Sequence, residues 1–311
     1  EIAKSHTRGS KSFVSNPNQH FTRNGELSDF MHLNCVSYLG PNKWYDAGDE
    51  RFKPTNLIFD SREANILAII DKETGKIVWK IGPDFNASKE ERRIGQIIGP
   101  HHTHMIPKGL PGEGNILVFD NGGWAGYGNP NNFSFDGTKV DRRDHSRVLE
   151  IDPITLKVVW SVKGSDLGEG MMPICQDTAF YSQLISSAQR LPNGNTLIDE
   201  GSFCKVFEVT PDKEVVWEYK APFQGKYGSG MVYRAYRYPY EWVPQLPKPE
   251  EVAVPRLDNW TFRVPGAAPG LPTDDVMTKV PDALGYTSVM AACVTDDQMA
   301  DGDDEPSGAR F

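Results

Sequence analysis

The sequence of 311 residues contains no run of about 18 apolar residues, so it predicts no membrane-spanning helix. Positive charge is also scarce, because 33 Lys and Arg stand against 42 Asp and Glu, a formal net charge of -9. Binding to a phosphate backbone needs clustered Lys and Arg, so nucleic acid is excluded as a partner. No GxxxxGK[ST], GxSxG or HExxH motif occurs, which argues against nucleotide-driven transfer.

Cysteine is rare, and its spacing excludes two common sites. The four cysteines are Cys35, Cys175, Cys204 and Cys293, and no two of them form a CxxC pair, which disfavours a zinc ribbon or a thioredoxin-type site. Cys175 and Cys204 flank one repeat, so a disulfide in an oxidising compartment and two buried thiols are both open interpretations. The chain starts at Glu1 rather than Met, and we expect a processed or truncated product.

Turn-forming residues are abundant, with 29 Gly and 23 Pro, and the chain repeats itself. The repeats span residues 31–82, 100–163 and 183–220, and each contains four short β-branched runs separated by turn sequences such as Pro192-Asn193-Gly194. This pattern predicts an all-β fold, a β-propeller of four-stranded blades. Each repeat closes on Val-Trp, so we expect Trp79, Trp160 and Trp217 to pack between neighbouring sheets.

The repeats suggest two regions. We expect a β-propeller domain over residues 1–246, followed over 247–311 by a Pro-rich C-terminal extension, an extended strap ending in an acidic tail. Because a ring needs four to eight blades, further blades are degenerate or lie outside this chain. Long loops at residues 82–100, 123–146 and 164–180 are expected to surround a site, since long loops on a rigid scaffold are usually functional.

The histidines are placed unevenly, since all seven precede residue 146. Aligning Ile106-Pro107 with Leu191-Pro192 puts His102 opposite Ser187, and a looser match puts His32 at the same level. Such positions on the first strands of successive blades would converge on the axis of the propeller. Alternation along a strand would also turn His102 and His104 to one face, with His101 and Thr103 on the other.

A cluster of His32, His102 and His104 can support two kinds of chemistry. One imidazole can act as a nucleophile and another as a general acid or base, because their unperturbed pKa of about 6.5 suits both roles. Alternatively, three neutral imidazoles can hold a divalent transition metal with an open position. The residues leave both interpretations open.

Other side chains suit an anionic aromatic substrate. Arg62 and Arg147 follow or begin strands of the repeats, and a guanidinium matches the oxygens of sulfate or phosphate. Aromatic side chains in the connecting loops could form walls for a flat ring. The predicted substrate-binding set is Trp124, Tyr127, Tyr181, Asn121 and Ser187; the other loop aromatics are Trp44, Tyr45 and Phe180.

Several motifs together resemble the bacterial arylsulfotransferase (arylsulfate sulfotransferase) family. They are His32-Leu33-Asn34, Phe59-Asp60-Ser61-Arg62, His102, Phe119-Asp120-Asn121-Gly122, the stretch from Ser186 to Ile198, and Tyr233-Arg234-Ala235-Tyr236-Arg237-Tyr238. The resemblance covers roughly residues 30–240, and its most specific piece runs from Ser186 to Ile198.

The resemblance implies a six-bladed propeller in the periplasm or outside the cell. It implies an enzyme that moves a sulfuryl group from a small aromatic sulfate ester to a phenol without a nucleotide donor or other cofactor, through a sulfated histidine. His32 and His102 match the motif histidines, with His104 beside them, and Arg62 or Arg147 would bind the sulfate oxygens. The sequence departs from the family in one respect: Ser187 stands where characterised members have the nucleophilic histidine of a later blade.

Two alternatives follow from this departure. One is a metal-dependent lyase, hydrolase or oxidoreductase using His32, His102 and His104. The other is a non-catalytic propeller, a subunit of a larger assembly or a homo-oligomer, since a fold does not fix a function.

Overall fold

The computed structural model describes residues 31–123, 125, 141–168, 176–221 and 231–253. They fall into two compact units. The first holds the described residues up to 221 together with 231–237, and the second holds 238–253. The sheets and the residues of the candidate site all belong to the first unit. The predicted extension from 247 lies mostly outside the described residues and stays a prediction.

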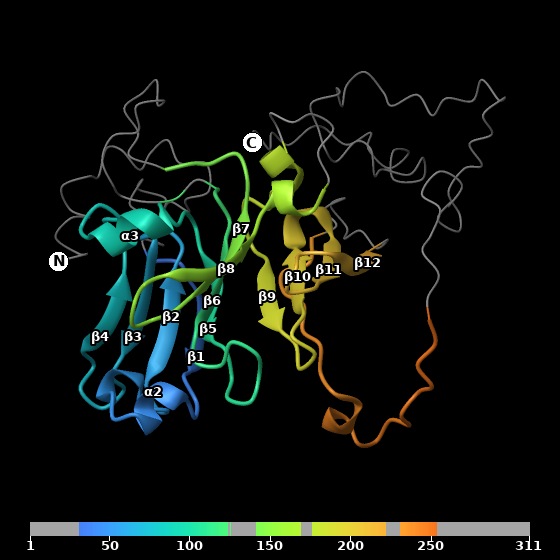
Figure 1. Ribbon diagram of the computed structural model, residues 1–311, viewed down its shortest axis with the longest axis horizontal. Coiled ribbons are helices and arrows are strands. Elements are labelled where there is room, and N and C mark those ends of the chain that lie inside the picture. The colour runs from blue at the N-terminus through green and yellow to red at the C-terminus, as the bar shows by residue number, and fades with distance from the viewer. Residues whose placement is uncertain (1–30, 124, 126–140, 169–175, 222–230, 254–311) are drawn as a thin grey trace, which may run out of the picture. The chain divides into compact units, whose positions relative to one another are not determined.

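The first unit is built from three four-stranded antiparallel sheets, each a simple meander in chain order (Figure 1). They confirm the all-β fold of four-stranded blades predicted from the repeats. The strands are β1 Leu33–Tyr38, β2 Leu57–Ser61, β3 Ile66–Ile70 and β4 Ile77–Ile81; β5 His101–Met105, β6 Ile116–Asp120, β7 Arg147–Ile151 and β8 Val158–Val162; and β9 Ser187–Arg190, β10 Thr196–Glu200, β11 Lys205–Val209 and β12 Val215–Lys220.

In the described residues, helical structure is confined to short connections. The helices are α2 Lys43–Asp46 and α3 Lys89–Ile94, and single 3₁₀ turns occupy Glu50–Phe52, Gly164–Asp166, Gln176–Ala179, Gly201–Phe203 and Tyr240–Trp242. In the part of the chain that the structure describes, no helix has both the length and the apolar character that crossing a membrane requires.

The turns that separate the strands are stabilised locally. Asp71 Oδ1 accepts the backbone N–H groups of Glu73 and Thr74, and Asp152 Oδ1 accepts those of Ile154 and Thr155. A carboxylate that mimics a backbone turn in this way favours a tight hairpin. The same turn therefore joins the third and fourth strands of the first two sheets.

Apolar side chains fill the space between neighbouring sheets. One buried cluster joins the first sheet to the second and a separate one joins the second to the third. The tryptophans that close the repeats take part in both contacts, because Trp79 Nε1 donates to Pro153 O and Trp160 Nε1 donates to Pro211 O, each at 2.9 Å. The predicted packing between sheets is confirmed for these two, whereas Trp217 is 37% exposed.

The segment 231–237 continues the pattern of the first strands of the sheets, β1, β5 and β9, which we call the inner strands. The N–H of Thr103 in β5 donates to Asp60 Oδ2, and the N–H of Ala188 in β9 donates to His102 Nδ1. The N–H of Ala235 likewise donates to Ser187 Oγ at 3.2 Å. Each inner strand is thus held by a side chain of the preceding sheet, and 231–237 takes the next place in the series.

A second contact supports this equivalence. Arg190 of β9 pairs with Glu150 and lies over the Trp160 ring at 5.4 Å. Arg237 pairs with Glu208 and lies over the Trp217 ring at 5.2 Å. Residues 231–237 therefore lie on the third sheet as the first strand of a fourth blade would.

Candidate functional site

Of the inner strands β1, β5 and β9, only β5 carries predicted site histidines, His102 and His104. In β9, Ser187 pairs with Asp199, and in β1 the residue at this level is Cys35, which pairs with Asp60. The alignment that put His32 there is therefore off by three residues. His32 lies just before β1, half-buried, and its carbonyl accepts the N–H of Arg62.

His102 is locked into one tautomer. It lies within a register shift between His101 and His104, has a φ of +54° that non-glycine residues seldom adopt, and is 4% exposed. Its Nδ1 accepts the N–H of Ala188 at 3.3 Å, so in the neutral ring Nε2 carries the proton and donates to Tyr236 Oη at 3.0 Å. Burial, and then the charges of His104 and Arg234, hold its pKa well below 6.5.

His104 has the opposite tautomer. Its Nδ1 lies 2.9 Å from the carbonyl of His102, which can only accept, so Nδ1 carries the proton and Nε2 keeps a lone pair. Burial lowers its pKa, and the positive charge of Arg234 lowers it further. The two rings lie with centroids 4.5 Å apart, as the alternation predicted. A neutral imidazole with an available nitrogen is a competent nucleophile.

The ring of His101 does not join His102 and His104, and its role is structural. Its Nδ1 lies 2.7 Å from Asn121 Oδ1 and 3.0 Å from Gly99 O, and its Nε2 accepts the N–H of Ile185. Burial lowers its pKa to about 3, with a contribution from the charge of Arg62. Both ring nitrogens are used, so this residue links β5 to the loop before β9.

Arg62 remains available for an anion. It is 3% exposed, its Nη1 pairs with Glu63, and its Nη2 is buried without a hydrogen-bond partner. It lies close to Gly99, whose missing side chain would be 3.7 Å from Arg62 Cγ. A buried guanidinium with an unused N–H is expensive to leave unpaired, which makes it a plausible recognition group for an oxyanion.

Two residues of 231–237 join the site, and the sequence reasoning did not assign them. Arg234 donates to the carbonyl of Asn34 in β1 at 3.0 Å, and its Nε is buried without a partner. Tyr236 contacts His102 edge-on, with ring centroids 5.1 Å apart. A signal was present, since Ala235-Tyr236-Arg237-Tyr238-Pro239 repeats the pattern of Ala188-Gln189-Arg190-Leu191-Pro192 at the start of the third repeat.

Buried hydrogen-bond donors without a partner gather on these same inner strands. A buried polar group left unpaired costs free energy, so such a cluster indicates a polar ligand. In the described residues, these donors on β1, β5 and 231–237 are Asn34 Nδ2, Ser37 Oγ, Thr103 Oγ1 and Arg234 Nε; two further ones are Arg62 Nη2, just after β2, and Tyr181 Oη.

Several predicted site residues have structural roles instead. Arg147 was predicted to bind an anion, but its guanidinium pairs with Asp120 and donates to the carbonyls of residues 94–96. Asn121 is fully buried, with both amide atoms used by His101, Ser182 and Ile185. Most hydrogen-bonding atoms of these two side chains are therefore used within the fold.

The remaining predicted residues divide in the same way. Ser187 Oγ is used by the backbone of Ala235, both as a donor and as an acceptor, so it holds 231–237 rather than substrate. The hydroxyl of Tyr181 is buried without a partner, and this residue stays a candidate. Trp124, Tyr127 and Cys175 lie outside the described residues, so their predicted roles, including the disulfide to Cys204, stay predictions.

A metal centre was the alternative use of the histidines. Within the described ranges, no group of three His, Cys, Asp or Glu side chains is arranged to hold a metal ion. His32, His102 and His104 are consequently not brought together as a ligand set.

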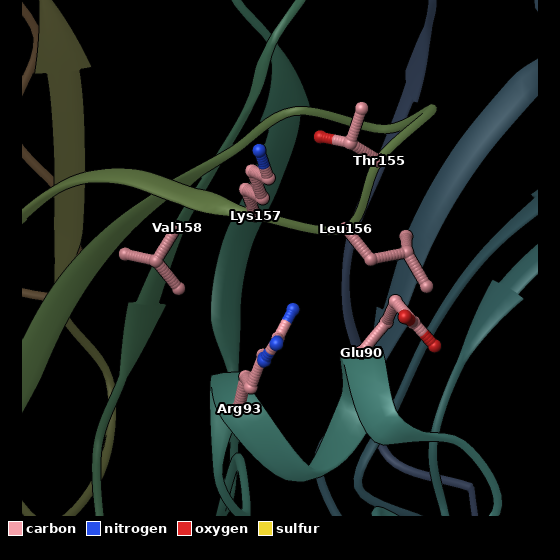
Figure 2. A pocket seen from close by; sticks show the side chains of 6 residues that line it. All are labelled: Glu90, Arg93, Thr155, Leu156, Lys157 and Val158. Atoms are coloured by element: carbon pink, nitrogen blue, oxygen red, sulfur yellow. The ribbon is translucent and has the colours of Figure 1, made fainter.

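A surface hollow lies away from these strands. It is lined by α3 and by the turn before β8, and Figure 2 shows Arg93 and Lys157 extending into it. Its lining residues are Glu90, Arg93, Thr155, Leu156, Lys157 and Val158. None of them is a histidine, and two like charges share the space, so we assign no catalytic role to this hollow.

Comparison with known proteins decides the family. The sequence profile described as Arylsulfotransferase (ASST) matches residues 3–222, which is more than half of the chain. The chain belongs to the arylsulfotransferase family. The inner-strand histidines and the three blades of this arylsulfotransferase-family chain all lie within the matched residues.

Other comparisons add little. No curated protein matches the chain. Among solved structures it is similar to a protein of unknown function from Bacteroides caccae, with 15% identity over 53% of this chain and 42% of that chain and a TM-score of 0.29. It is also similar to the β-propeller domain of Myceliophteria thermophila Cps50 (Swd1), with 13% identity over 65% and 57% and a TM-score of 0.28. The chain spans about half the length of these structures, and the scores are too low to carry an argument.

Proposed function

We propose that this chain catalyses sulfuryl transfer from an aryl sulfate ester to a phenol, with His104 as the nucleophile and no nucleotide donor. The observation that carries the proposal is the tautomer of His104. Because Nδ1 is committed to the carbonyl of His102, the lone pair resides on Nε2. This would replace the histidine that other family members carry at the position of Ser187.

Two guanidinium groups support the proposal that the transferred group is an anion. Arg234 is close enough to His104 to lower its pKa, and both Arg234 and Arg62 have a buried N–H without a partner. Guanidinium donors bind the oxygens of a sulfuryl group and offset the negative charge that develops during its transfer. Arg62 and Arg234 are thus the proposed oxyanion ligands.

The reaction proceeds in two balanced halves. In the first, His104 Nε2 attacks sulfur, the bond from sulfur to the aryl oxygen breaks, and a general acid gives its proton to the leaving phenol. In the second, the oxygen of the acceptor phenol attacks sulfur and gives its proton back to that group, the S–N bond breaks, and neutral His104 returns. Splitting the transfer through a covalent intermediate lowers each barrier.

The lowered pKa of His104 fits this role. Burial disfavours the imidazolium, so the neutral nucleophilic ring predominates at pH 7. The scheme requires no metal, and we expect turnover to survive dialysis against a chelator. The family resemblance also supports a periplasmic or extracellular location, which cell fractionation would test.

The test is direct. The full chain is incubated with 4-nitrophenyl sulfate and phenol, nitrophenol release is followed, and the quenched protein is digested for mass spectrometry. We expect release together with a sulfated peptide containing His104, and loss of both in His104→Ala. His145→Ala is the matched control, because that ring pairs with the exposed carboxylate of Asp144 and lies outside the proposed catalytic group. Absence of both signals in the unmodified chain would rule the proposal out and favour a binding protein.

A further inference from the structure

Tyr236 occupies a position equivalent to that of His104. The N–H groups of Thr103, Ala188 and Ala235 are each accepted by the preceding sheet. The residues that follow them are His104, Gln189 and Tyr236. A phenol hydroxyl is therefore held at the level of the proposed nucleophile, two places further along the series of inner strands.

The hydrogen bond between His102 and Tyr236 has a fixed direction. Since Ala188 donates to His102 Nδ1, the neutral ring must donate from Nε2 to Tyr236 Oη, at 3.0 Å. Arg234 Nη1 also approaches Oη, at 3.4 Å. The tyrosine oxygen is the acceptor in both contacts, so its own proton points to neither of these neighbours.

Exposure places this hydroxyl at the boundary of the site. His102 is 4% exposed, whereas Tyr236 is 44% exposed. A substrate approaching the buried histidines from the open side would meet the tyrosine first. Buried His102 in turn orients the ring of Tyr236 and fixes its hydroxyl.

The chemistry of the proposed reaction suits a tyrosine. The leaving group of an aryl sulfate and the acceptor are both phenols, the same chemical group as the tyrosine side chain. A tyrosine hydroxyl can give its proton to the leaving aryl oxygen in one half of the reaction and take the proton of the acceptor phenol in the other.

We propose that Tyr236 is the general acid and base of sulfuryl transfer, oriented by His102. This inference rests on the proposed function. As His104 Nε2 attacks sulfur and the S–O bond breaks, the Tyr236 hydroxyl gives its proton to the leaving aryl oxygen. The resulting phenolate accepts hydrogen bonds from His102 Nε2–H and Arg234, then takes the proton of the acceptor phenol as that oxygen attacks sulfur and the S–N bond breaks.

The experiment compares donors with different leaving groups in the full chain. A leaving group that is already a weak base needs no proton, so Tyr236→Phe should lower kcat/KM for phenyl sulfate about 100-fold, and that for 4-nitrophenyl sulfate only about 3-fold or less. Tyr238→Phe is the matched control, since that ring stacks on Trp242 instead, with centroids 4.3 Å apart. The control should leave both substrates unaffected.

A second measurement does not depend on a variant. In the unmodified protein, phenyl sulfate should show a solvent deuterium isotope effect on kcat/KM of about 2, and 4-nitrophenyl sulfate an effect close to 1. If the unmodified chain transfers sulfuryl groups but Tyr236→Phe slows both donors equally, or no isotope effect appears with phenyl sulfate, Tyr236 is not the proton donor. If the unmodified chain transfers nothing, the proposed function itself fails.

Discussion

The three tryptophans that close the repeats offer the same substitution in three environments. Trp79 is 6% exposed and donates to the carbonyl of Pro153 in the next sheet, whereas Trp217 is 37% exposed. In the described residues no sheet follows the third one, and Trp217 instead lies under Arg237. Replacing each by Phe therefore probes the contact between blades at a nearly constant shape.

The expected magnitudes follow from these contacts. Trp79→Phe removes a hydrogen bond and leaves a buried carbonyl without a partner, about 1–1.5 kcal/mol. The smaller ring leaves a gap that adds about 1–1.5 kcal/mol, a total of about 2–3 kcal/mol. Trp217→Phe should cost roughly 0.5 kcal/mol, because it loses only partly buried surface. Trp160, which donates to Pro211, should fall between them.

Differential scanning calorimetry measures this series without relying on tryptophan fluorescence. At about 2–4 °C per kcal/mol for a chain of this size, we expect Trp79→Phe to lower Tm by about 5–10 °C and Trp217→Phe by about 2 °C or less. Equal shifts for the two variants, or a larger shift for Trp217→Phe, would refute the interpretation that these side chains stabilise the fold through the next sheet.

Three further predictions concern charge. Burial raises the pKa of Asp199 to about 8, so the folded state keeps a proton that the unfolded state has lost. The free energy of unfolding should therefore fall as pH rises from about 4 to 8, by up to about 1.4 kcal/mol per pH unit. Urea titrations at several pH values should show this fall in the unmodified protein and not in Asp199→Asn. The pKa of His104 is lowered, so kcat/KM should stay level down to pH 6.5 and decline only below it; a decline centred above 6.5 would contradict the assigned nucleophile. Arg147→Met should lower the free energy of unfolding by about 2–3 kcal/mol, because it breaks a buried ion pair. It should leave KM for the sulfate donor unchanged, whereas Arg62→Met should raise that KM.

The candidate site shows where sequence reasoning was sufficient. Alternation along one strand predicted that His102 and His104 lie together, and their rings do, although a register shift between His101 and His104 interrupts the regular alternation of β5. His32 was misplaced by three residues, because the match of Met31-His32-Leu33-Asn34 to the later repeats was loose and the one-residue register shift between Leu33 and Cys35 cannot be seen in an alignment. In the sequence there was the same reason to expect anion binding at Arg62 and at Arg147, and only their neighbours in the folded structure distinguish them.

Longer-range contacts could not be predicted in the same way. Tyr236 meets His102 across 134 residues of sequence, and its importance follows from the position of 231–237 on the third sheet. The carbonyls of residues 94–96 that occupy Arg147 come from a loop of irregular structure. Contacts of this kind depend on how sheets pack, which no local pattern encodes.

The sequence by itself determined the blades, the tryptophan contacts between the first sheets and the pairing of two histidines, because strand alternation and turn chemistry act over a few residues. Only the tertiary structure decided which nitrogen of each histidine carries a proton, which arginines keep an unpaired N–H, and that Arg234 and Tyr236 join the site. Protonation and pairing depend on neighbours in space, and those neighbours come from different blades.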